Sequence, residues 1–214
     1  MASGTSAPVA FFVDLNLATA LSNVRVAMKE AADKSSLRRL QLYDEKIPCK
    51  PGCAACCNRQ VYLTVAEALV IQEYLEKSGQ WPQVEKRARE LMPIAKDASP
   101  VSWFKMNIMC PVLDPVTKLC TAYETRPAAC STHFVRSDPA QCDPWTMKSG
   151  KYDSIELKSI FEDFQKGLRS TVDGYGILAL KFPMPIALIF AARIKVQSGV
   201  GPNEIMNLIF NELQ

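Results

Sequence analysis

The sequence is poor in histidine and in long apolar runs, and both shortages exclude familiar functions. His133 is the only histidine among 214 residues, and no serine or carboxylate partner for it can be identified, so no hydrolytic triad is indicated. The longest apolar stretch, 176–196, is interrupted by two prolines and by Lys181 and Arg193. That pattern is typical of a buried element and predicts no membrane span and no membrane partner.

The sequence also has little excess of positive over negative charge. The formal net charge is +3, and no run of basic residues stands out, so nucleic acid is not expected as a partner. The first residues carry no positive charge, and the apolar patch after them is interrupted by Asp14 and Asn16, which argues against a signal peptide. A cytoplasmic protein is therefore expected, in a compartment where clustered cysteines are metal ligands more often than disulfides.

Cysteine, by contrast, is concentrated in one part of the chain. Four cysteines fall within nine residues around a Pro51–Gly52 turn, and no cysteine lies outside residues 49–142. Thiolates are the ligands that zinc and iron–sulfur clusters select, and short spacings let a turn bring several sulfur atoms together. The predicted metal ligands are all eight: Cys49, Cys53, Cys56, Cys57, Cys110, Cys120, Cys130 and Cys142.

Cys56 and Cys57 are direct neighbours, which restricts how they can bind. Adjacent side chains in a helix or a strand point in different directions. Either Cys57 faces a second site, or the backbone there is neither helix nor strand. A disulfide between them would be strained. Eight thiols could fill two four-sulfur sites, or one cluster with additional thiols around it, and ligand type alone does not separate zinc from iron.

The rest of the chain is expected to be mainly α, as helices packed around a small, irregular, cysteine-rich metal module. Apolar spacing predicts helices over 12–33 and a second, short one after Ser35 or Ser36. Capping boxes at Thr64–Glu67 and Asp153–Glu156 predict two more helix starts. Between them, a proline-rich region suggests a short β-hairpin, 109–113 with 118–122. The helices that we expect along the chain are 12–33, 36–43, 64–78, 82–93, 157–168, 185–197 and one after Pro202.

A single domain is predicted, with N-terminal helices in 1–45, the cysteine module in 46–146 and C-terminal helices in 147–214. The module resembles the YkgJ-type cysteine-cluster family, described as zinc- or iron-chelating domains. The resemblance is carried by Cys49-x3-Cys53-x2-Cys56-Cys57, Cys110-Pro-Val-Leu, Cys120-Thr-Ala-Tyr123, Arg126-Pro-Ala-Ala-Cys130 and Cys142. One departure is Ser131-Thr-His133, where the family usually has a basic residue and an aromatic one.

The resemblance implies metal binding. It is shared more distantly by flagellin lysine N-methylases, whose cysteine cluster is thought to hold an iron–sulfur centre, so a redox or methyl- or alkyl-transfer reaction is one expectation. The cofactor expected is an iron–sulfur cluster (4Fe-4S), or else zinc. The alternative is a zinc-stabilised interaction module without catalysis, with a protein or small molecule as partner. Arg126, Tyr123 and His133 are expected next to the ligands, with Arg126 offsetting thiolate charge.

Overall fold

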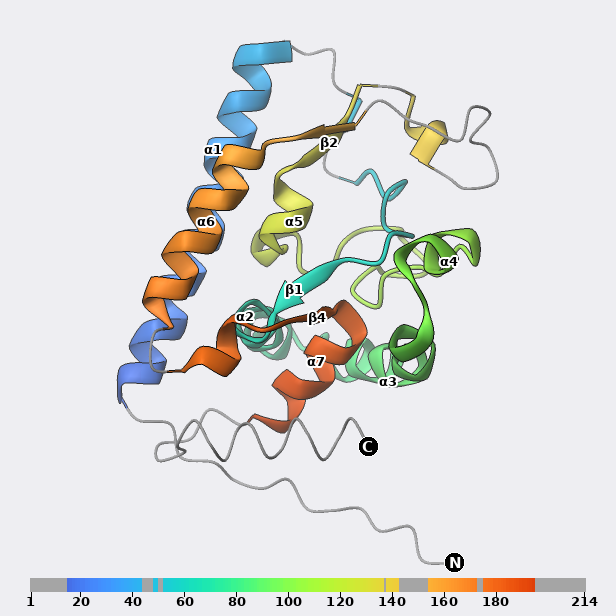
Figure 1. Ribbon diagram of the computed structural model, residues 1–214. Coiled ribbons are helices and arrows are strands. Elements are labelled where there is room, and N and C mark those ends of the chain that lie inside the picture. Colours follow the sequence, from blue (N-terminus) through green and yellow to red (C-terminus); the bar gives the residue numbers. More distant parts are fainter. Residues whose placement is uncertain are drawn as a thin grey trace, which may run out of the picture.

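The computed structural model describes residues 15–43, 48–49, 52–136, 138–142, 154–172 and 175–194 (Figure 1). It confirms a mainly helical protein. The helices are α1 (Leu15–Tyr43), α2 (Val65–Lys77), α3 (Trp81–Asp97), α4 (Pro100–Lys105), α5 (Ala128–Ser131), α6 (Lys158–Thr171) and α7 (Met184–Arg193). Short 3-10 turns are η2 (Tyr123–Thr125), η3 (Pro139–Cys142) and η4 (Gly176–Ala179). No described helix is both long enough and apolar enough to cross a membrane.

Two small antiparallel sheets join segments that are far apart in sequence. One pairs β1 (Tyr62–Thr64) with β4 (Lys181–Pro183), and the other pairs β2 (His133–Val135) with β3 (Ser154–Glu156). The hairpin expected around Asp114 is reduced to one bridge, between Leu113 and Cys120. Its turn is closed by the carboxylate of Asp114, which accepts hydrogen bonds from two backbone N–H groups.

The main core lies where α2, α3 and α7 pack together. Nearly every residue of α7 up to Ala191 is buried, which confirms the buried element expected in this part of the sequence. Thr64 begins α2 with the predicted capping box, and Gly79, with φ +70°, follows its end. Pro93 does not end α3, which continues to Asp97. β1 and β4 lie against this core, where β1 leads from the cysteine turn into α2 and β4 leads into α7 (Figure 1).

α1 is one continuous helix, so the expected break at Ser35 is wrong. Ser35 is buried, and its hydroxyl donates to the carbonyl of Ala31 within the same helix instead of capping a new one. The first half of α1 packs as expected, through Leu17, Leu21 and other buried residues. Leu37, expected to pack on the metal region, is 60% exposed.

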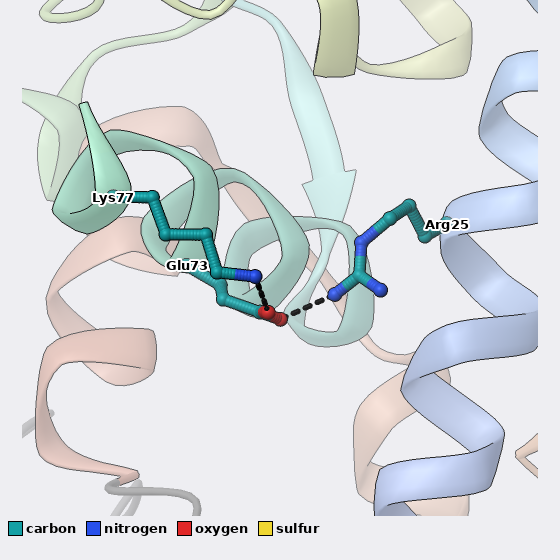
Figure 2. A network of polar contacts seen from close by, with 3 residues as sticks. All are labelled: Arg25, Glu73 and Lys77. Carbon is teal, nitrogen blue, oxygen red and sulfur yellow. Dashed lines mark hydrogen bonds and ion pairs between the residues drawn. The ribbon is translucent and has the colours of Figure 1, made fainter.

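α1 packs along α6 (Figure 1). An ion pair also connects α1 with α2. Glu73 of α2 accepts from Arg25 of α1 and, over 2.6 Å, from Lys77 one turn further along α2 (Figure 2). All three side chains are substantially exposed, so the pairs contribute at most about 1 kcal/mol each. The packing of apolar faces therefore accounts for the position of α1.

α6 begins differently from what the sequence indicated. Ser154–Glu156 forms β3, and the N-cap of α6 is Leu157, which makes no side-chain cap. The helix start expected from the capping box Asp153-Ser-Ile-Glu156 is wrong, because Ser154–Glu156 pairs with β2 and α6 begins only at Lys158. The predicted apolar face of α6 is confirmed at Phe164 and Leu168, which are buried. The helix expected after Pro202 lies outside the described residues.

Candidate metal centre

A tight turn presents three of the cysteines. The N–H of Cys57 donates to the carbonyl of Ala54 over 2.9 Å, and that of Arg59 donates to Cys56 over 3.1 Å. Gly52 enters this turn with φ +88°, a conformation that favours glycine. The backbone at Cys56 and Cys57 is neither helix nor strand, which is one of the two arrangements expected for adjacent ligands.

Three cysteines from later segments come to this turn. The N–H of Cys110 donates to the carbonyl of Cys57 over 2.7 Å, which joins the two segments directly. Cys120 pairs with Leu113 in the single β-bridge. Cys130 lies on α5, whose first N–H group, at Ala128, donates to the buried carboxylate of Glu67 over 3.0 Å. Helix α2 thus holds the segment that carries Cys130.

Hydrogen bonds from other segments position Cys49 and Cys142, the first and last cysteines of the module. The sulfur of Cys49 accepts a hydrogen bond from the N–H of Val135 over 3.3 Å, and its carbonyl accepts from Arg39 of α1. The carbonyl of Cys142 accepts from the amide of Asn58 over 3.5 Å. Both residues are therefore attached to the cysteine turn or to β2, although they stand at the ends of the module.

Six of the eight cysteines line one cavity of about 460 Å³. Met184 of α7 also lines it, and its sulfur lies 3.3 Å from the sulfur of Cys110. Cys49 and Cys142 are not among the lining residues. The cysteines that line the cavity are Cys53, Cys56, Cys57, Cys110, Cys120 and Cys130. All eight cysteines of the chain are free thiols.

Burial dominates the ionisation of most of these thiols. Desolvation raises the pKa of Cys110 to about 12 and that of Cys142 to about 12, and it also raises the pKa of Cys130. Cys56 is the exception, because a hydrogen bond from the Cys57 thiol lowers its pKa to about 7. The same contact raises the pKa of Cys57. Cys56 is therefore the most readily ionised member of this pair.

The residues expected beside the ligands all line the cavity. The guanidinium of Arg126 stacks on the ring of Tyr123, 4.3 Å from its centroid, and its charge lowers the pKa of Cys120, although burial raises that pKa more. The Nε2 atom of His133 lies 2.9 Å from Arg59 Nη1. Because a guanidinium only donates, Nε2 accepts this hydrogen bond, so its lone pair is not directed at a metal.

Sequence reasoning missed Arg59, Lys181 and Met184, which also line the cavity. Arg59 follows the cysteine turn by two residues, a spacing that could have indicated it. Lys181 and Met184 come from β4 and the start of α7, far from any cysteine in sequence, and only the pairing of β4 with β1 brings them here. No local pattern marks them.

The donor set suits a thiophilic metal. Within the described parts of the chain, no three Cys, His, Asp or Glu side chains converge into a preformed site, so a bound metal would have to draw the thiols inward. Among the lining residues of the cavity, Arg126 has a buried Nε atom that makes no hydrogen bond in the described structure. A metal-bound sulfur beside Arg126 would supply an acceptor, and several thiols around one cavity are the ligands that zinc and iron–sulfur clusters use.

Comparison with protein families identifies this region. Residues 48–153 match the model of the CxxCxxCC family, described as a "putative zinc- or iron-chelating domain". This segment of the chain is similar to that family. The YkgJ-type resemblance fits the match, and it supports metal binding through the CxxCxxCC cysteines. Comparison with curated proteins and with solved structures finds no match.

Proposed function

We propose that the eight cysteines supply the ligands of an iron–sulfur centre of the 4Fe-4S type, in which each cluster takes four thiolates, and that the chain supports a redox or alkyl-transfer reaction. The observation that carries the proposal is the shared cavity lined by six free thiols. A structural zinc ion and a 4Fe-4S cluster each take four protein ligands, so six thiols around one space exceed what either group alone requires. When bound, such a cluster would supply one-electron transfer.

The contacts favour two groups of thiols that meet at the vicinal pair. Cys57 is joined to the Cys110 segment by a backbone hydrogen bond, and its thiol lies within electrostatic range of Cys110 and Cys130. Cys49 and Cys142 lie in range of Cys53 and Cys56, and Cys56 is also in range of Cys110, Cys120 and Cys130. We assign Cys110, Cys120 and Cys130 to one group and Cys49, Cys53 and Cys142 to the other, with Cys56 and Cys57 between the two groups.

Arg126 and His133 would serve the centre without binding the metal. Arg126 lies within electrostatic range of Cys56 and Cys120, where its charge offsets that of thiolates. His133 accepts from Arg59 and so fixes a second guanidinium next to the cysteine turn. Electrostatic stabilisation of bound thiolates is the role that these positions support.

The test is anaerobic purification with iron, zinc and acid-labile sulfide counted per chain. A brown protein that contains iron and sulfide in equal amounts supports the proposal. A colourless protein that contains stoichiometric zinc supports the second candidate, a zinc-stabilised interaction module, which the family description also allows. Absence of both metals from freshly purified, folded protein would overturn metal binding altogether.

A further inference from the structure

The cavity that six cysteines line also has basic side chains in its lining. Three basic residues, Arg59, Arg126 and Lys181, are among its lining residues, and none of the described lining residues is an aspartate or a glutamate. Ligand cavities in proteins commonly have volumes of about 300 to 1,000 Å³, are mainly apolar and contain a few polar groups. At about 460 Å³, this cavity falls in that range. The two guanidinium groups stand beside the thiols, whereas no acidic lining residue offsets the ammonium of Lys181, so an anion is favoured there.

The three cations divide between two ends of the cavity. Arg59 and Arg126 act on the thiols, since the charge of each favours ionisation of Cys56. Lys181 stands apart from this group on β4. The charges that act on its ammonium are those of Glu67 and Arg169. The cavity therefore has a sulfur end with two guanidinium groups and a separate end with one ammonium.

The ammonium of Lys181 is available to a ligand. In the part of the chain that the structure describes, it makes no hydrogen bond and no ion pair, and the carboxylate of Glu67 is instead occupied by Thr64 and Ala128. Lys181 Nζ lies 5.2 Å from the ring centroid of Phe161, whose side chain also lines the cavity. The residue is exposed, so a ligand can reach it from solvent.

We propose that this cavity binds a small carboxylate with an aromatic or apolar body. Lys181 pairs with the carboxylate, Phe161 and Tyr62 contact the body, and the far end of the ligand faces the thiols. The site thus places an organic acid next to the metal centre proposed above. The binding itself depends on Lys181 and the apolar lining, and not on which metal the thiols hold.

The probe is 4-phenylbutyrate, titrated into full-length protein as purified and followed by ligand-observed NMR. Its amine counterpart, 4-phenylbutylamine, has the same body with the opposite charge. The acid should bind and the amine should bind at least about 10-fold more weakly, because only the acid pairs with Lys181. Equal binding of acid and amine, or no binding of the acid, would overturn the proposal. Inorganic phosphate that binds as tightly as the acid would also overturn it, since the apolar body would then contribute nothing.

Variants separate Lys181 from general surface charge. Lys181→Gln should weaken binding of the acid about 10-fold, whereas Lys166→Gln, an exposed lysine of α6 outside the cavity lining, should leave it unchanged. Phe161→Leu should weaken binding of the acid and of the amine together. Metal is counted in every sample: if the unmodified protein has its full metal content but does not bind the acid, this inference alone is refuted, and if the unmodified protein binds the acid but contains no metal, the proposed function alone is refuted.

Discussion

The backbone N–H of Cys110 donates a hydrogen bond to the carbonyl oxygen of Cys57 over 2.7 Å. This bond joins the cysteine turn to the segment that follows α4, so the two thiols are neighbours before any metal binds. Cys110 is also in contact with Met184 of α7, within the main core. The folded chain therefore brings together thiols from two segments that are far apart in sequence.

Cys57→Ser and Cys110→Ser should each lower the metal content per chain by at least half, because a hydroxyl is a poor ligand for thiophilic metals. Elemental analysis of anaerobically purified variants measures this effect. Ser99→Ala, which removes an N-cap on α4 away from the thiols, is the control and should lower stability by about 1 kcal/mol without changing metal content. Full metal content in both cysteine variants would remove these residues from the ligand set.

Gly52→Ala should destabilise the cysteine turn, because the φ of Gly52 is +88° and side chains avoid that region. The new Cβ would also lie 3.4 Å from Leu119 Cδ2. We expect a loss of about 1–2 kcal/mol in the free energy of unfolding together with reduced metal content, measured by urea titration and elemental analysis. Gly167→Ala, within α6 and with no atom near its added Cβ, should instead stabilise the protein by about 0.5–1 kcal/mol. Equal effects of the two substitutions would contradict the role assigned to Gly52.

Glu67→Gln should cost about 1–3 kcal/mol in the free energy of unfolding, because the buried carboxylate accepts from Thr64 and from Ala128, and an amide nitrogen cannot accept. The substitution should also disturb α5 and hence Cys130. Urea titration gives the stability, and metal content reports on Cys130. Glu90→Gln, on the exposed face of α3, is the matched control and should change neither quantity. A Glu67→Gln variant as stable as the Glu90→Gln variant would show that these bonds do not hold α5.

Helix positions were predictable wherever a single local pattern acts without competition. Thr64 and Glu67 cap α2 as the sequence indicates, because no distant segment competes for that backbone. The same pattern fails at Glu156, whose backbone pairs with β2. Ser35 fails for another reason, since its hydroxyl can bond to Ala31 inside a helix as easily as cap one. A local sequence pattern does not show which of several possible hydrogen-bond partners a residue will have in the folded protein.

The candidate site was predictable in its ligands but not in its surroundings. Cysteine spacing and the family resemblance indicated all eight thiols and Arg126, and the structure places six of these thiols and Arg126 around one cavity. Lys181 and Phe161 come from β4 and α6, and no sequence pattern connects them with the cysteines. Tertiary pairing alone brings them to the cavity, so the inferred ligand end of the site could not be predicted.

Arg126→Gln should weaken metal binding about 10-fold, because it removes the charge that stabilises thiolates of Cys56 and Cys120. The measurement is competition with a chelator whose complex with the metal has a known affinity. Arg38→Gln, at an exposed position on α1, is the control for net charge and should leave the affinity unchanged. If both variants lose affinity equally, overall charge and not the position of Arg126 is responsible.

Metal affinity should rise with pH through the neutral range. The pKa of Cys110 and of Cys142 is raised to about 12 by burial, so without metal both thiols keep their protons at neutral pH. Each protonated thiol that becomes a ligand releases one proton, so the apparent affinity should fall about 10-fold per thiol for each unit by which the pH drops. Cys56 has a pKa of about 7, so its thiol is already ionised at higher pH. It adds to the pH dependence of the metal affinity only when the pH is below this pKa.

Competition with a chelator between about pH 6 and about pH 8, corrected for the protonation of the chelator itself, measures this slope. Proton release on addition of zinc to metal-free protein in weakly buffered solution gives an independent count of the thiols that bind. Cys110→Ser should lower both the slope and the proton count by about one, whereas Ser99→Ala should change neither. An affinity that is flat over this range, with no proton release, would mean that the buried thiols are not the ligands.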